Sequence, residues 1–185
     1  RLSNDWETHV DKCGVLINRL LAMFPGVRRY MQARRSEVER TGQVVSATGR
    51  IRHLPYPKRS DFATERLWKK AKKRVENQAI NYPVQAFAAD ITGAALIDLE
   101  TALCASYGTT LLTLHQRLLN HDYPTMPLII GEVHDEITID LPNKKDVVMI
   151  AEVMEEVRSL RKLCPEFDLP LTVEATLGSA WGLSC

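Results

Sequence analysis

A strand–turn–strand pattern between residues 128 and 141 constrains the fold of this chain more than any other feature. Leu128–Gly131 and Ile137–Leu141 are short, rich in β-branched residues and close to alternating, so each is predicted to form a strand. The polar interruption Val133–Glu136 is short enough for a hairpin turn. Such a turn holds one histidine and two carboxylates at a sheet edge, and fixed carboxylates suit a divalent cation.

His134, Asp135 and Glu136 also fit a plain solvated turn. Aspartate belongs in turns, and histidine and glutamate tolerate them. Taken alone, these residues favour the plain turn. The choice between the two interpretations therefore depends on the rest of the chain.

The charge of the chain is divided unevenly. Residues 1–80 carry 18 Lys and Arg against 8 Asp and Glu, a net of +10, whereas residues 81–185 carry 6 against 15, a net of −9. A basic half joined to an acidic half indicates a polyanionic partner on one side and a cation site on the other. Neutralisation of one half by the other across an interface explains the asymmetry equally well.

Composition and cysteine spacing exclude several classes. The chain is 45% hydrophobic and 25% charged, which is typical of a soluble globular protein. It has no apolar run long enough to span a bilayer and no signal-peptide pattern, so we expect no membrane partner. Its four cysteines lack C-x-x-C spacing and indicate reduced intracellular thiols. Because it starts at Arg1 and not at Met, we expect a truncated or processed form, or part of a longer protein.

Basic residues recur on the elements expected in the first half. A basic helix is predicted over Val27–Glu39, after the Phe24-Pro25-Gly26 break. A small hairpin around Thr48–Gly49 is predicted to point Arg50 and Arg52 to one side. These elements are candidates for phosphate contact.

A further basic helix is predicted after Asp61, which is expected to cap it. Its cations, which include Lys69 and Lys73, surround much of its circumference. A solvated surface is the commoner role of such a helix. Its position after two arginine-bearing elements nevertheless favours contact with phosphates.

Tyr82-Pro83 predicts a break, because the residue before proline resists helical angles. The apolar segment Val84–Ala105 then predicts a long buried helix. Gln85 at its start and Asn81 four residues earlier offer amide groups to a specific ligand, although helix capping is the commoner use of such residues.

The remaining chain is predicted to form two helices, a strand and a tail. The helices are expected over residues 109–121 and Lys145–Leu163, and the strand over Leu171–Leu177. Trp181 belongs to the tail.

Five segments in this order resemble the C-terminal part of a family A DNA polymerase of the bacterial DNA polymerase I type: Phe24–Arg28, Gly42–Pro55, Glu76–Asp90, Val133–Glu136 and Val173–Trp181. The third matches E-x-x-A-x-N-x-P-x-Q-x-x-A-A-D, and the fourth is similar to the family's motif C. The resemblance covers nearly the whole chain. Each segment is weak alone, and the five together are specific.

The sequence departs from the family pattern at several positions. Asn77 stands where an arginine is usual, which puts one primer-side contact in doubt, and Ala86 replaces a glycine. Glu132 stands where a glutamine commonly precedes motif C and adds negative charge beside the expected metal site. Motif A, with the first catalytic aspartate, and motif B, whose lysine and tyrosine lie over the incoming nucleotide, are not found in the sequence.

The resemblance implies an α+β fold. It is an antiparallel palm sheet in which the motif C hairpin packs on the long buried helix, joined to a mainly helical, basic part of the fingers. Residues 1–75 are expected to be the C-terminal part of the fingers subdomain and residues 76–185 the C-terminal part of the palm subdomain.

The implied activity is that of a DNA-directed DNA polymerase, which transfers nucleotides with two Mg²⁺ ions. Asp135 is expected to be a metal ligand, Glu136 an auxiliary carboxylate near the metals, and His134 a hydrogen-bonding group near the primer 3′ end. Gln85 and Asn81 are expected to contact the terminal base pair from the minor groove, whose acceptors are shared by all correct pairs. Template and primer phosphates are expected to lie against four cations: Arg50, Arg52, Lys69 and Lys73.

The implied partners are primer–template DNA, a dNTP, and a second polypeptide or an N-terminal portion that carries motifs A and B. With one of the two metal aspartates, the chain alone is not expected to polymerise. The expected location is the cytoplasm of a bacterial or phage-infected cell, with an organelle as the alternative.

Two other functions remain open from the sequence. A non-catalytic, architectural DNA-binding subunit of a polymerase complex fits the charge distribution equally well. A phage-type single-subunit RNA polymerase fragment also has a His-Asp turn, but Glu136 and Gln85 favour DNA. A His-Asp metal hydrolase is disfavoured, because the other histidines lack ligand spacing.

Overall fold

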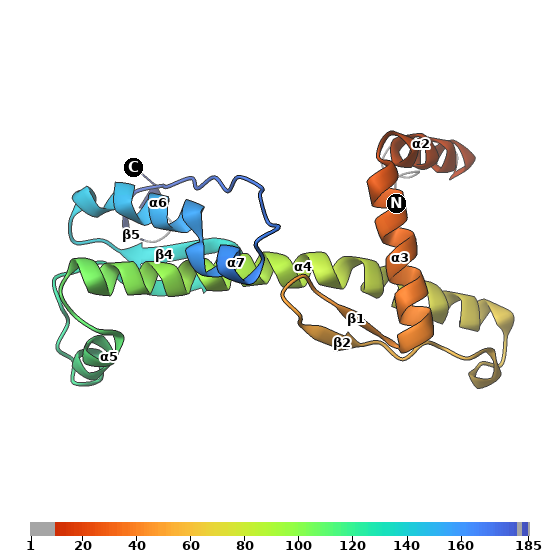
Figure 1. Ribbon diagram of the computed structural model, residues 1–185, viewed down its shortest axis with the longest axis horizontal. Coiled ribbons are helices and arrows are strands. Elements are labelled where there is room, and N and C mark those ends of the chain that lie inside the picture. Colours follow the sequence, from red (N-terminus) through yellow and green to blue (C-terminus); the bar gives the residue numbers. More distant parts are fainter. Residues whose placement is uncertain (1–9, 181–182, 185) are drawn as a thin grey trace. The chain divides into compact units, whose positions relative to one another are not determined.

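The computed structural model describes residues 10–180 and 183–184, and the chain separates into two compact units, residues 1–85 and 86–185 (Figure 1). The tail residue Trp181 lies outside the described residues.

The helices and strands of the first unit are α2 (Val10–Met23), α3 (Pro25–Thr41), β1 (Gln43–Val45), β2 (Ile51–His53), η1 (Arg59–Asp61) and the first part of α4 (Glu65–Ser106). The second unit contains the rest of α4, followed by α5 (Leu111–Leu119), β3 (Leu128–Val133), β4 (Glu136–Asp140), η2 (Lys144–Asp146), α6 (Val147–Glu156), α7 (Arg158–Leu163), β5 (Gly178–Ala180) and β6 (Leu183–Ser184).

The predicted basic helix and small hairpin are confirmed as α3 and β1–β2. Pro25 occupies the first turn of α3, where its missing N–H costs nothing. Gly42 ends the helix with φ +66°, and its N–H donates to the Val38 carbonyl. The chain then turns directly into β1, which pairs antiparallel with β2.

The core of the first unit joins α3, the β1–β2 hairpin and α4. Val38, Val44, Leu54 and Ala79 are buried together, and Tyr82 packs against them. Figure 1 shows α3 crossing the beginning of α4 and the hairpin running beside it. These contacts fix the hairpin against α4 through Val44 of β1 and through Leu54, which follows β2.

The second unit is built on the later part of α4. One core joins α4 residues Leu99 and Leu103 to α5, α6 and the β3–β4 hairpin, through Leu114, Ile150 and Ile139 respectively. The predicted hairpin is thus confirmed, and it packs on the later part of α4 as expected. The expected burial of this helix holds on one side only, because Val84 and Ile97 are more than half exposed.

A second cluster covers another stretch of α4. Ala94 and Ala95 are buried with Val157 and Leu160 of the α6–α7 region, and Phe87 lies edge-on to Phe167 with the ring centroids 5.2 Å apart. Small residues on α4 let the neighbouring elements approach closely. The fold is α+β, as predicted from the sequence.

The expected break at Pro83 is wrong, because α4 continues through it. A proline in a helix interior costs about 3 kcal/mol. Ala79 before it is fully buried, and Tyr82, Phe87 and Ile91 are partly buried against cores on the two sides of it. Full burial of one large apolar side chain contributes about 1.5–3 kcal/mol, so several partly buried ones together exceed the cost of one proline. Burial on both sides of Pro83 therefore outweighs the local penalty. The N-terminal cap of α4 also differs from the prediction. The Leu67 N–H donates to Thr64 Oγ1 (3.3 Å), so Thr64 takes the role expected of Asp61.

Two predictions for the C-terminal region also differ from the structure. The helix expected over Lys145–Leu163 is divided at Val157, which is fully buried with φ +40°. The strand expected over Leu171–Leu177 is irregular. There, the Val173 N–H donates to the Glu155 side chain (3.1 Å), so a side-chain acceptor takes the place of a strand partner.

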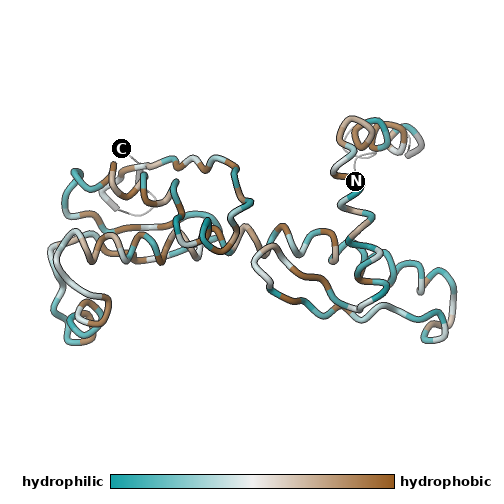
Figure 2. Tube along the Cα trace, in the orientation of Figure 1, coloured by the Kyte–Doolittle hydropathy of each residue, from teal (hydrophilic) through white to brown (hydrophobic). Residues whose placement is uncertain are grey.

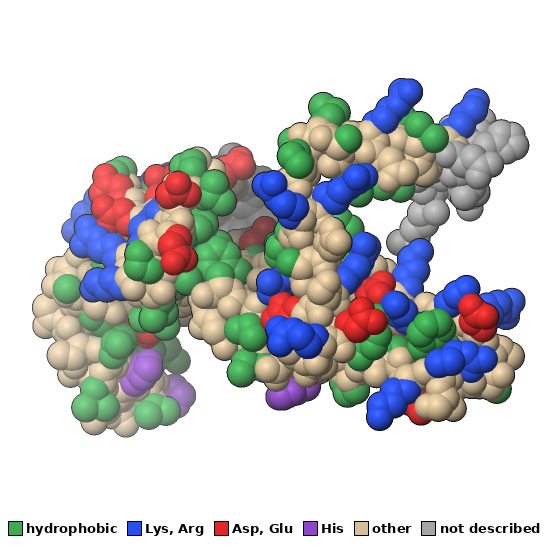
Figure 3. All heavy atoms as spheres, turned by 45° about the vertical axis from the view of Figure 1, so that its right-hand side comes forward, with side chains coloured by type: hydrophobic (Ala, Val, Ile, Leu, Met, Phe, Trp, Pro, Cys, Tyr) green, Lys and Arg blue, Asp and Glu red, His purple; other side chains and the backbone are tan. Residues whose placement is uncertain are grey.

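Charged and hydrophobic residues are distributed differently in the two units. Lys and Arg side chains gather over α3 and the first part of α4 (Figure 3). The same part of α4 is largely hydrophilic in Figure 2, and hydrophobic residues recur along its later part. In the part of the chain that the structure describes, no helix combines the length and apolar character that a bilayer span requires.

Candidate functional site

The β3–β4 turn contains only two residues. Val133 pairs directly with Glu136, which leaves His134 and Asp135 between the strands. His134 has φ +60°, a left-handed conformation that histidine adopts more readily than most residues. All of these side chains are exposed, so the turn presents its polar groups to solvent or to a ligand.

Asp135 and Glu136 fit part of a magnesium site. Mg²⁺ sites in proteins combine one or two carboxylates with water molecules and substrate phosphates, and these two carboxylates are neighbours at an exposed turn. Over residues 10–180 and 183–184, no three His, Cys, Asp or Glu side chains are grouped closely enough to hold a metal ion. Asp135 and Glu136 therefore offer two hard oxygen ligands on neighbouring residues.

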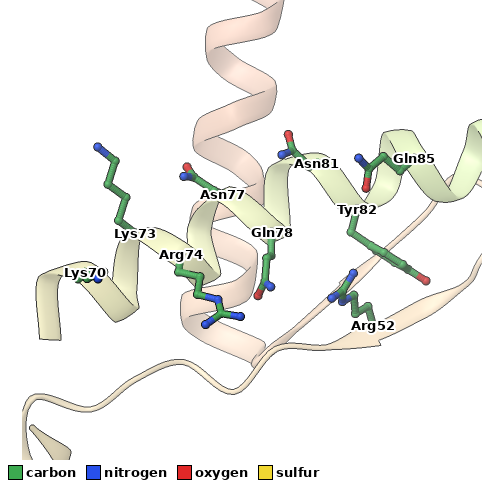
Figure 4. Close-up of a pocket in the computed structure, with 9 residues that line it drawn as sticks. All are labelled: Arg52, Lys70, Lys73, Arg74, Asn77, Gln78, Asn81, Tyr82 and Gln85. Carbon is green, nitrogen blue, oxygen red and sulfur yellow. The ribbon is translucent and has the colours of Figure 1, made fainter. Parts of the chain in front are cut away.

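A groove of about 610 Å³ lies on the first unit, between α4 and β2 (Figure 4). It is lined by four cations, four amides and one aromatic residue: Arg52, Lys70, Lys73, Arg74, Asn77, Gln78, Asn81, Gln85 and Tyr82. None of these nine residues is acidic. The lining is therefore suited to a polyanion.

The groove residues of α4 form one helical stripe. Positions 70, 73, 74, 77, 78, 81, 82 and 85 follow one another at three- and four-residue spacing, which brings them to one side of a helix. The cations occupy the beginning of the stripe and the amides its end. Cations suit phosphates and amides suit base edges, so the stripe offers both kinds of contact in order.

Arg52 enters the groove from β2. Its guanidinium lies over the ring of Tyr82, with Cζ 5.2 Å from the ring centroid. Tyr82 itself packs on the core of the first unit. An aromatic face attracts a cation at this distance, and the pair joins β2 to α4 at the groove (Figure 4).

Lys72 belongs to a different face of α4. Its ammonium lies 5.7 Å from the ring centroid of Tyr56 and 5.6 Å from that of Trp68. It also lies 3.8 Å from Glu76, which accepts a hydrogen bond of 3.1 Å from Tyr56. Hydrogen bonding to Tyr56 raises the pKa of Lys72, and burial raises the pKa of Tyr56. Lys72 thus stays charged and serves the packing of the 55–57 segment on α4.

Comparison with known proteins decides the family. The sequence model described as DNA polymerase family A matches residues 1–183. The chain belongs to DNA polymerase family A. The resemblance inferred from the five sequence segments is confirmed.

The relatives are bacterial DNA polymerases I. The enzyme of Pseudomonas aeruginosa is 32% identical over 165 residues, which are 89% of this chain and 15% of that protein. That of Bacillus caldotenax is 31% identical over 168 residues, with 89% and 16% covered, and that of Thermus aquaticus is 28% identical over 184 residues, with 98% and 18% covered. The chain thus spans less than a fifth of the length of these relatives.

The fold agrees with the family. A solved structure described as the POL domain of Pol1 from M. smegmatis, in complex with DNA primer-template and dNTP, superimposes with a TM-score of 0.67. It is 22% identical, and the match covers 94% of this chain and 26% of that one.

Four of the six predicted DNA-binding residues of this family A chain lie in the groove: Arg52, Lys73, Asn81 and Gln85. Asn81 and Gln85 are inside α4 and not at its ends, so the capping role considered for them is excluded. Arg50 and Lys69 are outside the groove lining. The backbone N–H of Arg50 donates to Ser46 Oγ (3.1 Å) in the β1–β2 turn, and the Lys69 ammonium lies 2.6 Å from the Glu65 carboxylate.

Five groove residues were not singled out as site residues from the sequence: Lys70, Arg74, Asn77, Gln78 and Tyr82. The helical spacing from position 70 to position 85 contains the signal that could have found them. It was obscured by the break expected at Pro83, which separated Gln85 from the rest of the stripe. His134 and Asp135 form the β3–β4 turn, and Glu136 is the first residue of β4 beside them.

Proposed function

We propose that this chain is a C-terminal part of a DNA-directed DNA polymerase and supplies motif C and primer–template contacts for nucleotidyl transfer. The observation that carries the proposal is the family A match over residues 1–183, which includes the two carboxylates of the β3–β4 turn. In this assignment residues 1–75 belong to the fingers and residues 76–185 to the palm.

Mg²⁺ ions, when bound, would lower the pKa of the primer 3′-hydroxyl and neutralise the pyrophosphate that leaves. Asp135 acts as a metal ligand of this chain, and Glu136 is an auxiliary carboxylate beside it. His134 donates a hydrogen bond near the primer 3′ end. These roles use the exposure of all three side chains at one turn.

The groove of the first unit is the proposed primer–template contact. Lys73 and Arg52, together with Lys70 and Arg74, hold backbone phosphates. Asn81 and Gln85 contact the minor-groove edge of the terminal pair, where all correct pairs present acceptors in common positions. Arg50 and Lys69 add phosphate contacts outside the groove.

The chain requires a part of the polymerase that carries motifs A and B, either a second polypeptide or an N-terminal portion of a longer chain. Support comes from the extent of the match, because the chain spans less than a fifth of the length of its polymerase I relatives. The proposed location is the cytoplasm of a bacterial or phage-infected cell.

Binding of labelled primer–template duplex by the 185-residue chain tests the DNA-contact half of the proposal. We expect the dissociation constant to rise steeply with salt, because several cations release counterions from phosphates. Changing all four groove cations to Ala, in Arg52→Ala, Lys70→Ala, Lys73→Ala and Arg74→Ala, should abolish most of the binding. Equal affinity of this variant and the original chain would exclude the groove.

A non-catalytic architectural subunit is the second candidate, because the groove alone supports DNA binding. Polymerase activity of the assembled complex separates the two. Loss of activity in Asp135→Ala selects the catalytic role, and retained activity selects the architectural one.

A further inference from the structure

We infer that Tyr82 is a positioning residue that holds Arg52 in the groove for contact with a nucleic-acid phosphate. This inference rests on the proposed function, because it assigns the ligand of one side chain in the DNA-contact groove. The geometry that carries it is the guanidinium of Arg52 over the Tyr82 ring, 5.2 Å from its centroid.

The strand register brings Arg52 to this position. Arg52 is paired with Val44 across the β1–β2 hairpin, so their side chains lie on the same face. Val44 is fully buried in the core of the first unit, on which Tyr82 also packs. The stem of Arg52 is therefore directed along the hairpin face that meets α4.

The electrostatics of the groove explain why the ring is needed. Arg52 shares the lining with Lys70, Lys73 and Arg74, which repel it, and none of the nine lining residues is a carboxylate that could attract it. The residues of β2 are exposed, so an unheld arginine has free access to solvent. The electron-rich face of Tyr82 attracts the cation without neutralising it.

An arginine held this way is preorganised for a phosphate. Its full charge and its planar N–H donors remain available for a phosphate oxygen pair. Holding it in place lowers the rotamer entropy that binding removes from a long side chain. Arg50, in contrast, lies outside the groove lining.

Fluorescence anisotropy with a labelled primer–template duplex tests the inference in four variants of the full chain. Arg52→Ala and Tyr82→Leu are each expected to raise the Kd about three- to tenfold. The double variant is expected to raise it no further than Arg52→Ala does, because the ring acts through the arginine. Tyr82→Phe is the matched control, and it keeps the ring and should stay within about twofold of the original chain.

The salt dependence of binding separates positioning from a loss of folding. Tyr82→Leu and Arg52→Ala are both expected to reduce the slope of log Kd against log salt by about one, which corresponds to the loss of one phosphate contact. A purely structural role of Tyr82 leaves this slope unchanged, and circular dichroism of each variant reports its folding. An unchanged slope in Tyr82→Leu, or additive effects in the double variant, overturns the inference. If the original chain itself fails to bind the duplex, the proposed function fails instead.

Discussion

Val133 pairs directly with Glu136 across the β3–β4 hairpin, so His134 and Asp135 alone connect the two strands. This relationship fixes the two neighbouring carboxylates relative to each other, because Glu136 is held by the strand ladder and Asp135 by a two-residue turn. The turn is short because His134 accepts a left-handed conformation, with φ +60°. The geometry of the proposed metal site therefore depends on a strained backbone position.

The first prediction concerns that position. We expect His134→Val to be less stable than His134→Gly by about 1–2 kcal/mol, because a β-branched residue is penalised in the left-handed region whereas glycine is not. Urea denaturation followed by circular dichroism measures the difference. The same two substitutions at Asp135, whose φ lies outside that region, are the control and should show no such preference for glycine. Equal stability of the two His134 variants would contradict the assigned turn.

The second prediction concerns two adjacent lysines of α4. Lys73 lines the groove, whereas Lys72 lies over Tyr56 and Trp68. We expect Lys73→Ala to reduce the slope of log Kd against log salt for duplex DNA by about one. We expect Lys72→Met to leave the slope unchanged and to lower the free energy of unfolding by about 1 kcal/mol. Titrations at four salt concentrations measure both slopes, and the reverse pattern would show that the two faces of α4 are wrongly assigned.

The sequence correctly predicted those elements that are determined by residues close to one another in the chain. The β3–β4 hairpin, the small hairpin beside α3 and the basic charge of the first half follow from alternation, turn residues and composition. The family resemblance identified the family, which the match over residues 1–183 confirms, whereas the turn pattern alone favoured a plain turn.

Other features depend on long-range packing and were missed. α4 passes through Pro83 because side chains on both sides are buried in cores formed by distant segments. Val157 interrupts the α6–α7 region in a conformation that no propensity favours for valine, and it is fully buried. The role of Tyr82 could not be predicted, because its partner Arg52 is 30 positions earlier on another element.

The third prediction concerns pH. Tyr107 donates a hydrogen bond of 2.8 Å to Asp146, and this bond, with burial, raises the pKa of Tyr107 above its usual 10.0. A tyrosine whose pKa is raised by folding contributes stability that is complete below pH 10 and is lost as pH rises through the folded pKa. We therefore expect the stability of the chain to fall above pH 10.

Unfolding measured between pH 8 and about 11 tests this prediction in Tyr107→Phe, which is expected to lose stability at pH 8 and to show a smaller alkaline fall. Tyr123→Phe changes an exposed tyrosine and serves as the control. A Tyr107→Phe profile parallel to that of the original chain at every pH would remove the Tyr107–Asp146 bond from the account.

The fourth prediction concerns the amides of the groove. Asn81→Ala and Gln85→Ala remove groups proposed to contact base edges and not phosphates, so we expect weaker binding of a matched primer terminus with an unchanged salt slope. The anisotropy assay that measures the lysine variants also measures these. A reduced slope in either variant would instead assign the amide to the DNA backbone.

The central claim is that Asp135 supplies one carboxylate of a polymerase site whose remainder comes from another part of the enzyme. Primer extension with Mg²⁺, with and without the polypeptide from the same source that carries motifs A and B, tests it most directly. We predict no templated synthesis by the 185-residue chain alone and synthesis by the pair. When the chain in this pair carries Asp135→Ala, we predict that primer extension is at least about a thousandfold slower and that duplex binding is retained. Asp140→Ala, at the far end of β4, is the matched control and should extend normally. Extension by the chain alone, or by the Asp135→Ala pair at the original rate, would contradict the account.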